Sequence, residues 1–336
     1  MGVYHLMGLG RSPGTVIGPL TYLAHRYQRW NDEDQRFFAR SGEVRQRAAG
    51  QKVGDLQALV LFTTQEIIQA TRENTGDKRK NTAILSYDYI DNPPGRKTSE
   101  PKRPPGPMRD ILRDLLQREW PAIAGGRPAG TVFWCAVDRR DIRLTYERVV
   151  RVIAALAGTG GQGKEMWINL TGGNNVINLA LELAAALSGD VARLYYVQAE
   201  DEIAERCVRF TAEDGYWVDL PIMPLAFGRL RQVIIDLLTE RETLSLSDLY
   251  SRLRSEYWDL SRGLDSEETL REEYLKPLWK QGILTERAPG VYTLGPQWEL
   301  VRPYQKALEE ARGRRETLEA LCEREDWIQM EEIRLG

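Results

Sequence analysis

One stretch of the chain joins a short apolar segment, a glycine turn and a long apolar segment in direct succession. Met166–Leu170 has the length and composition of a buried strand, and Thr171-Gly-Gly-Asn174 interrupts it. Asn175–Leu187 then repeats apolar side chains at helical spacing. A strand that turns into a helix in this way leaves backbone N–H groups and the positive end of the helix dipole at one place. Adjacent glycines let an anion approach there, so the turn favours an anion site, with a purely structural turn as the alternative.

The N-terminus carries a second turn of the same kind. Val3–Met7 has the pattern of a strand, and Gly8-Leu-Gly-Arg-Ser-Pro-Gly14 has that of a turn. Thr15, a candidate N-cap, begins a helix that we expect to run to Tyr27. Arg11 supplies a cation to the turn and Ser12 supplies a hydroxyl. In a doubly wound sheet, ligands bind at the carboxyl ends of the strands, so two such turns predict a ligand with several phosphates.

Two further observations narrow the chemistry. The spacing Gly8-x-Gly10-x-x-x-Gly14 resembles part of a dinucleotide fingerprint, but no acidic residue follows at the ribose-reading distance after a clear second strand. The chain has only two histidines, His5 and His25, which leaves no material for a Ser-His-Asp triad or a histidine metal site. We expect His5 in the core or beside the ligand and His25 on the solvated side of a helix. No metal and no cofactor is expected.

Length and composition set the outer limits. A chain of 336 residues favours two domains, and a net charge of −3 does not demand nucleic acid as a partner. Its three cysteines are far apart and odd in number, which disfavours a disulfide framework or a zinc cluster and favours a reducing cytoplasm. No signal peptide and no apolar run of membrane-spanning length is found. The expected location is cytoplasmic, without a membrane partner.

From residue 1 to about 225, predicted strands and helices alternate. This alternation predicts an α/β fold: a Rossmann-like parallel sheet with helices on both faces. Besides the two turn units, the predicted strands are 59–63, 82–90, 131–137 and 192–197, and the predicted helices are 64–72, 108–119 and 142–157. The proline-rich segment 93–107 is basic, and it is either a solvated loop or a loop that closes over an anionic ligand.

From residue 226 to 300 the pattern changes to that of a winged helix-turn-helix domain. The predicted helices are Leu230–Arg241, Ser245–Tyr257 and Asp265–Gln281, and the predicted wing strands are Ile283–Glu286 and Val291–Leu294. Glutamates crowd the third helix, where a DNA-reading helix places cations, so dimerisation or coupling is favoured over DNA recognition. We expect residues 301–336 to form a C-terminal helical extension, with a charged helix at 302–324.

Three segments together resemble a known family. Gly8–Gly14, Leu59–Glu66 and Asn169–Asn174, the last before a long apolar helix, look like the CRISPR-associated Rossmann fold (CARF) domain. The resemblance covers about the first 225 residues by motif and the remainder by the layout of CARF ring nucleases and CARF transcription regulators. It implies a homodimer whose paired turns form one pocket for cyclic oligoadenylate, as the tetra- or hexaadenylate. This ring is the messenger of antiviral type III CRISPR complexes.

The resemblance also implies roles for single residues. Some family members cut the ring without metal, because the ribose 2′-hydroxyl attacks the adjacent phosphorus and leaves a 2′,3′-cyclic phosphate end. Here Ser12 matches the position that orients this phosphate, and Arg11 matches the position that stabilises its charge. The implied ligand contacts are Gly8, Leu9, Gly10, Thr15, Thr64, Asn169, Thr171, Gly172, Gly173, Asn174 and Asn175. Asn174 and Asn175 stand where related proteins often place a lysine, a departure that weakens the case for fast cleavage.

Three functions therefore remain open. The first is a ring nuclease that lowers the level of the messenger. The second is a ligand-gated transcription regulator that reads DNA through the winged helix. The third, ranked last, is a dinucleotide-dependent oxidoreductase.

Overall fold

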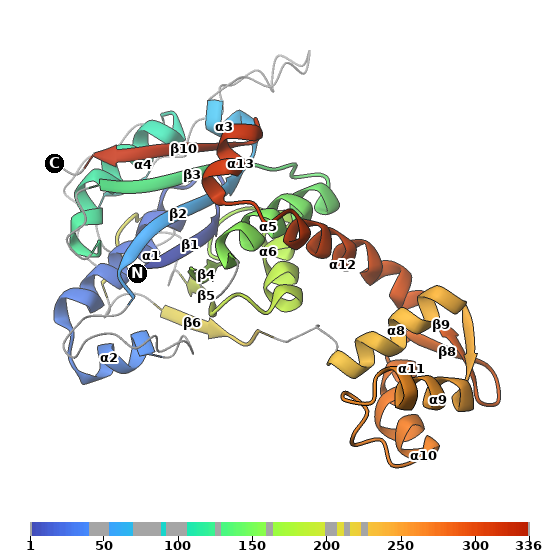
Figure 1. The fold of residues 1–336 in the computed structure, drawn as a ribbon. Helices are drawn as coiled ribbons and strands as arrows, with labels where there is room; N and C mark the ends of the chain where they lie inside the picture. The colour runs from blue at the N-terminus through green and yellow to red at the C-terminus, as the bar shows by residue number, and fades with distance from the viewer. Residues whose placement is uncertain are drawn as a thin grey trace. The chain divides into compact units, whose positions relative to one another are not determined.

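The computed structural model describes residues 2–39, 54–69, 89–91, 106–124, 129–158, 164–198, 207–211, 216–222 and 228–334. These residues belong to two units (Figure 1). The first contains residues 1–223 together with 310–336, and the second contains residues 224–309. The chain leaves the first unit near residue 223. It re-enters that unit near residue 309, inside helix α12 (Pro296–Arg314).

The first unit is built on a seven-stranded sheet in the order β10-β3-β2-β1-β4-β5-β6. Its strands are β1 (Val3–Gly8), β2 (Leu56–Thr63), β3 (Ala129–Ala136), β4 (Glu165–Asn169), β5 (Arg193–Gln198), β6 (Tyr216–Leu220) and β10 (Ile328–Arg334). The strands from β3 to β5 are parallel, and only the edge strands β6 and β10 pair antiparallel. The predicted α/β class with a mostly parallel, Rossmann-like sheet is confirmed, and its parallel strands follow the doubly wound order.

Helices cover both faces of this sheet. Helix α1 packs with α4, and α5 packs with α6 (Figure 1). The described helices of this unit include α1 (Gly14–Arg29), α2 (Asp32–Ala39), α3 (Gln65–Gln69), α4 (Met108–Glu119), α5 (Ile142–Ala157), α6 (Asn175–Ser188) and α13 (Leu318–Arg324), with a 3-10 turn at Trp120–Ala122. Helices α4 and α5 have the predicted bounds. Most of the predicted strand at 82–90 and of the loop at 93–107 lies outside the described residues.

The start of α1 differs from the prediction. The helix begins at Gly14 with Pro13 at the N-cap, so Thr15 is inside the first helical turn and is not the cap. The Thr15 hydroxyl instead donates to the Ser12 carbonyl over 2.9 Å. Proline suits this end of a helix because the N–H that it lacks would have no helical partner there.

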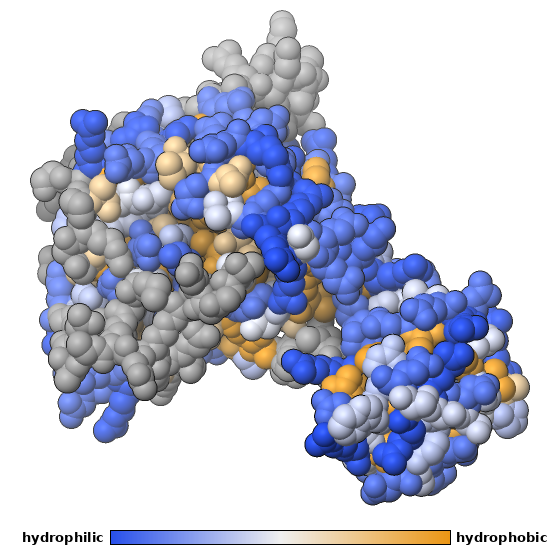
Figure 2. All heavy atoms as spheres, viewed as in Figure 1, coloured by the Kyte–Doolittle hydropathy of each residue, from blue (hydrophilic) through white to orange (hydrophobic). Residues whose placement is uncertain are grey.

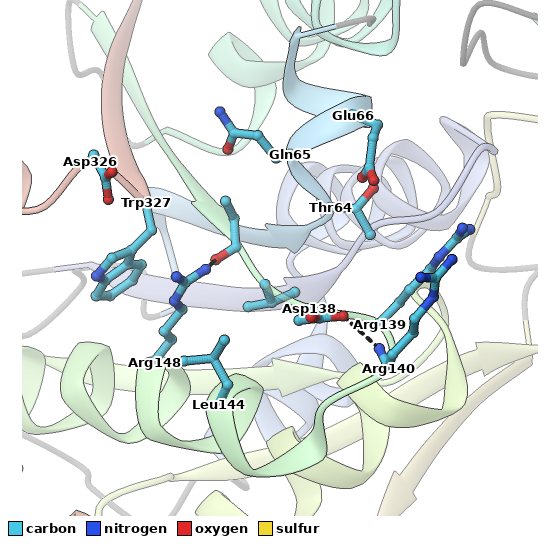
Figure 3. Close-up of a pocket in the computed structure, with 12 residues that line it drawn as sticks. Thr64, Gln65, Glu66, Asp138, Arg139, Arg140, Leu144, Arg148, Asp326 and Trp327 are labelled. Atoms are coloured by element: carbon cyan, nitrogen blue, oxygen red, sulfur yellow. Dashed lines mark hydrogen bonds between the residues drawn. The ribbon is translucent and has the colours of Figure 1, made fainter. Parts of the chain in front are cut away.

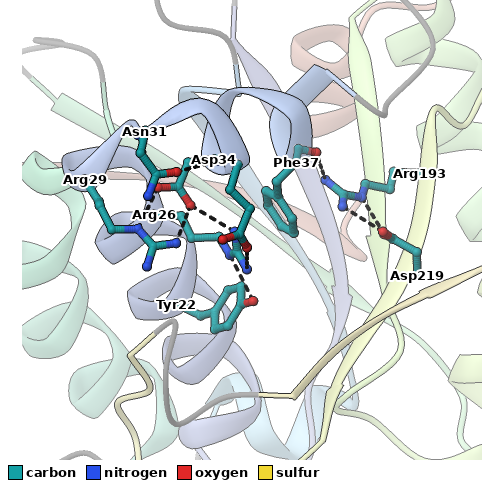
Figure 4. Close-up of polar contacts among 9 residues, drawn as sticks. Tyr22, Arg26, Arg29, Asn31, Asp34, Phe37, Arg193 and Asp219 are labelled. Atoms are coloured by element: carbon teal, nitrogen blue, oxygen red, sulfur yellow. Dashed lines mark hydrogen bonds and ion pairs between the residues drawn. The ribbon is translucent and has the colours of Figure 1, made fainter.

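Helix α2 was not predicted, and an ion-pair cluster fixes it against α1 (Figure 4). The buried Asp34 carboxylate accepts from Arg26 over 2.9 Å and from Arg29 over 2.7 Å. The hydrogen bond from Arg29 lowers the pKa of Asp34 below its ordinary value. Arg193 of β5 donates to the Phe37 carbonyl of α2 over 3.1 Å and pairs with Asp219 of β6 over 2.6 Å, which links α2 to the sheet.

The helix predicted at 302–324 is present as α12 and α13, but the residues after it do not continue the predicted helical extension. α13 is helical, but Ile328–Arg334 forms strand β10 beside β3. The Glu331 carboxylate accepts from Arg109 over 2.5 Å, from Arg113 over 2.7 Å and from the Trp134 indole over 3.0 Å. These contacts and the unpaired edge of β3 hold the segment as a strand, and neither can be read from the local sequence.

The second unit contains a three-stranded antiparallel sheet in the order β7-β9-β8. Its strands are β7 (Thr243–Ser245), β8 (Leu284–Ala288) and β9 (Val291–Leu294), and its helices include α8 (Arg229–Arg241), α9 (Leu246–Glu256), α10 (Glu267–Thr269) and α11 (Lys276–Lys280). Ser245 is the N-cap of α9, and β7 was not predicted. None of the helices in the described part of the chain is long and apolar enough to span a membrane.

The predicted helix at 265–281 is interrupted by a π-helical segment at Leu270–Leu275, between α10 and α11. Pro277 explains the interruption because it has no N–H to donate to the Glu273 carbonyl one turn earlier. Arg231 of α8 donates to that carbonyl instead, over 3.4 Å.

Candidate functional site

The two glycine turns lie against each other because β1 and β4 are neighbouring parallel strands. We call residues 8–14 the first turn and residues 170–174 the second turn. A Cβ atom added to Gly8 would lie 2.8 Å from the Gly172 carbonyl oxygen and 3.0 Å from the Gly173 Cα. The order of strands reverses between β1 and β4, and doubly wound sheets bind ligands in the crevice at such a point.

The glycines serve this contact between the turns. A Cβ on Gly172 would lie 2.3 Å from the Gly8 carbonyl oxygen and 2.6 Å from the Thr15 hydroxyl. Gly173 has a φ of +85°, and its added Cβ would lie 3.0 Å from the Gly8 Cα. The packing of the turns is therefore sufficient to require glycine at both positions. Gly10 differs, because the nearest atom to its added Cβ is the Gly173 carbonyl oxygen at 4.0 Å.

Several predicted ligand contacts use their side chains within the protein. The Asn169 amide oxygen accepts from the Thr171 N–H over 2.7 Å, and the Thr171 hydroxyl accepts from the Val197 N–H over 2.8 Å. The Asn174 amide oxygen accepts from the Ile177 N–H over 3.0 Å and so caps α6. These oxygens fix the shape of the second turn.

The first turn is joined to β2 through Leu9. The buried Leu9 donates its N–H to the Phe62 carbonyl over 2.9 Å, and its carbonyl accepts from the Thr63 hydroxyl over 2.8 Å. Arg11 is exposed and Ser12 is partly exposed, whereas Asn175 is exposed at the start of α6. Of the predicted contacts, the structure brings Gly8, Gly10 and Thr15 of the N-terminal segment against Gly172 and Gly173 of the second turn.

The sequence did not predict Asn178 of α6, whose side chain contacts both turns. Its amide nitrogen donates to the Leu170 carbonyl over 3.1 Å. Its amide oxygen would lie 3.1 Å from a Cβ on Gly8 and 3.2 Å from a Cβ on Gly173. That oxygen is buried and has no hydrogen-bond partner among the described residues. A polar residue in an otherwise apolar helix was the available signal.

A pocket of about 510 Å³ lies at the carboxyl ends of β2 and β3 (Figure 3). Of its residues, only Thr64 was predicted as a ligand contact, and Thr64 follows the Thr63 that bonds to the first turn. The pocket is lined by Thr64, Gln65, Glu66, Ala136, Val137, Asp138, Arg139, Arg140, Leu144, Arg148, Asp326 and Trp327. Asp326 and Trp327 come from the segment before β10, which the sequence could not place beside β2 and β3.

Arg148 is the partly buried cation of this pocket. It donates to the Ala136 carbonyl over 2.6 Å, and its guanidinium carbon lies 5.4 Å from the centre of the Trp327 ring. Burial lowers the pKa of Arg148 below its ordinary value. Within the described part of the chain, no carboxylate forms an ion pair with it. Trp327 is itself fixed, because its indole donates to Glu325 over 2.8 Å and its carbonyl accepts from the Ala136 N–H over 2.7 Å.

His5 lies in the core rather than in either site. Its Nδ1 is 2.8 Å from the Tyr195 hydroxyl, and its ring is fully buried. Burial, and secondly the charge of Arg193, lower the pKa of His5 to about 3. The imidazole is therefore neutral at physiological pH. The described residues also contain no cluster of histidine, cysteine, aspartate and glutamate that could hold a metal ion.

Comparison with known proteins gives one finding of similarity. No family model matches the chain. A protein of Archaeoglobus fulgidus described as uncharacterized is 24% identical over 253 residues, which cover 74% of this chain and 70% of that protein.

Proposed function

We propose that the chain is a CARF-type protein that binds cyclic oligoadenylate as a homodimer and cleaves the ring without metal. The observation that carries this proposal is the contact between the first and second turns at the point where the strand order reverses. A ligand with several phosphates is favoured there because two glycine turns and the start of a 14-residue helix meet.

Phosphate binding in this proposal depends chiefly on backbone groups. The first N–H groups of any α-helix have no helical partner, and in α6 the Asn174 side chain takes only that of Ile177. The N–H groups of Asn175 and Val176 precede it and suit an anionic oxygen. The open side of Gly10 gives a phosphate room to approach the first turn.

An apolar stripe on α6 supports the homodimer. Val176 and Leu183 are partly exposed, and the side chain of Leu179 between them is 48% exposed. Figure 2 shows apolar atoms gathered at the surface of the first unit, over the region that α6 occupies in Figure 1. The stripe starts just after the second turn. An isologous contact along it would therefore place the turns of both copies near the two-fold axis, where a ring of repeated nucleotides fits.

Ring cleavage in this proposal requires positioning rather than an imidazole base. The 2′-hydroxyl of one ribose attacks the adjacent phosphorus, the bond from phosphorus to the 5′-oxygen breaks, and the hydroxyl proton passes through water to the leaving 5′-oxygen. Alignment of these atoms lowers the barrier by several kcal/mol. Ser12 orients the phosphate, and Arg11 stabilises the charge that develops on its oxygens.

The second unit supplies the alternative function, a transcription regulator. We assign it a winged helix-turn-helix fold, with β8 and β9 as the wing. Glu268, Glu272 and Glu273 are exposed on the segment that would face the DNA groove, and they would repel phosphate. Coupling or dimerisation is therefore favoured. A gel shift with the promoter of its own gene, at moderate salt with and without the ring, tests this alternative, and the absence of a shift rejects it.

The test of the main proposal is incubation with cyclic tetraadenylate and cyclic hexaadenylate in the presence of a chelator. We expect linear products that carry a 2′,3′-cyclic phosphate, identified by mass spectrometry. Ser12→Ala should slow cleavage more than it weakens ring binding, whereas Arg11→Ala should weaken both. Ser247→Ala, an exposed serine of the second unit, is the matched control and should leave both unchanged. An intact and unbound ring would reject the proposal.

A further inference from the structure

The pocket at the ends of β2 and β3 is formed entirely within one chain. Its wall comes from the β2–α3 junction, the β3–α5 loop, α5 and the segment before β10. The cations that line it are Arg139, Arg140 and Arg148, and the carboxylates that line it are Glu66, Asp138 and Asp326. An occupant that carries both an anionic group and hydroxyl groups would satisfy both sets.

Arg148 indicates where the anion belongs. A partly buried guanidinium loses hydration, and this cost is usually offset by a carboxylate or another anion. Among the described residues, Arg148 bonds only to a backbone carbonyl and lies over the Trp327 ring, and the carboxylates of Asp326 and Asp138 act on it without forming an ion pair. The Ala136 carbonyl and Trp327 hold the guanidinium in place, while its other N–H groups remain available to an oxyanion.

Glu66 indicates where the hydroxyl groups belong. In doubly wound sheets, an acidic residue after the second strand accepts hydrogen bonds from the ribose hydroxyls of a nucleotide. Glu66 follows the end of β2 directly, in α3, and lines the pocket with a partly buried side chain. Figure 3 shows Glu66 and Thr64 on one side of the pocket, with Arg148 and Trp327 at another. Glu66 and Arg148 thus lie on different sides of the cavity.

We propose that this pocket binds a ribonucleotide, with a phosphate at Arg148 and the ribose hydroxyls at Glu66. The volume of about 510 Å³ lies within the range of small-molecule sites. The ligand is either a free mononucleotide or one nucleotide unit of the proposed cyclic oligoadenylate. The site does not depend on the ring-binding proposal, because one chain supplies every lining residue.

The experiment measures binding of adenosine 5′-monophosphate to the full-length protein by isothermal titration calorimetry. We expect saturable binding, and Arg148→Gln should weaken it about tenfold or more because a charge-assisted hydrogen bond to phosphate is lost. Glu66→Gln should reduce the preference for adenosine 5′-monophosphate over its 2′-deoxy form. Arg143→Gln is the matched control, because Arg143 is exposed on α5 outside the pocket. Arg148→Lys distinguishes a lost phosphate contact from a folding defect. It keeps the positive charge and should bind adenosine 5′-monophosphate more tightly than Arg148→Gln does.

A competition arm identifies the source of the nucleotide. Displacement of adenosine 5′-monophosphate by cyclic tetra- or hexaadenylate assigns the pocket to a unit of the ring, and binding without displacement assigns it to a free mononucleotide. If the protein binds adenosine 5′-monophosphate but neither cyclic oligoadenylate, the ring-binding proposal is rejected and the pocket proposal stands. No saturable binding at millimolar concentration would overturn the pocket proposal. Equal affinities of wild type, Arg148→Gln and Glu66→Gln would also overturn it.

Discussion

The contact between the turns predicts that Gly172→Ala destabilises the first unit. The new methyl group would lie 2.3 Å from the Gly8 carbonyl oxygen and 2.6 Å from the Thr15 hydroxyl. Ordinary contacts between heavy atoms are about 3.5–4.0 Å, so one of the two strand ends must move by about 1 Å. Overpacking of this kind destabilises the folded state by about 1–3 kcal/mol. Alanine also lowers the entropy of the unfolded chain, which offsets about 0.5 kcal/mol of that loss.

We therefore expect a net loss of about 1.5 kcal/mol in the free energy of unfolding, or roughly 3–6 °C in the melting temperature of a unit of this size. Circular dichroism melting and urea unfolding of the full-length protein measure it. Gly10→Ala is the matched control, because the nearest atom to its methyl group would be 4.0 Å away and its φ is not positive. That variant should be as stable as wild type or more stable by about 0.5 kcal/mol, because only the entropy of the unfolded chain changes. Equal stability of wild type and Gly172→Ala would show that the turns are not packed as described.

Two shorter predictions concern β10 and the dimer face. Burial tends to raise the pKa of Glu331, but the hydrogen bonds from Arg109 and Arg113 outweigh it and lower the pKa. Glu331→Gln should therefore cost about 2 kcal/mol of unfolding free energy at pH 7, and urea titrations should show this difference fading as the pH falls below the ordinary value of 4.5. Leu179→Asp should shift the protein from dimer to monomer in analytical ultracentrifugation, whereas an unchanged mass would exclude the α6 stripe as the interface.

The elements that the sequence predicts well are those whose signals are local. Helix α5 has an amphipathic pattern and an N-cap at Asp141, whose carboxylate accepts from the Arg143 and Leu144 N–H groups. Its bounds were therefore predictable. The two glycine turns were found for the same reason, since a turn between a strand and a helix carries its own signal. Their mutual contact follows once the parallel order of β1 and β4 is known.

The features that the sequence does not predict depend on distant partners. β10 contains two adjacent glutamates, Glu331 and Glu332, and its strand conformation requires the edge of β3 and the arginines of α4 around Glu331. The pocket at the ends of β2 and β3 could not be predicted for the same reason. Trp327 reaches the end of β3 only after the chain has returned from the second unit. The sequence also did not single out Glu66, the proposed ribose contact. α2 and the residues up to β2 separate it from the first turn by more than the usual distance in the chain.

The buried imidazole leads to a prediction about acid. The folded protein holds the pKa of His5 at about 3, whereas the unfolded chain has the ordinary value of 6.5. Between these values the unfolded state binds a proton that the folded state does not. The contribution to stability is therefore complete above pH 6.5 and is lost as the pH falls, by up to about 1.4 kcal/mol per pH unit. At pH 5 the loss amounts to about 2 kcal/mol.

Urea unfolding of wild type and His5→Gln between pH 5 and 7 measures this effect. Glutamine cannot titrate, so the variant should lose less stability than wild type over the interval even if it is less stable throughout. His25→Gln retains His5 and should follow the slope of wild type. Parallel slopes for wild type and His5→Gln would mean that the imidazole takes up a proton in the folded protein. The imidazole would then not be kept neutral by its burial beside Tyr195.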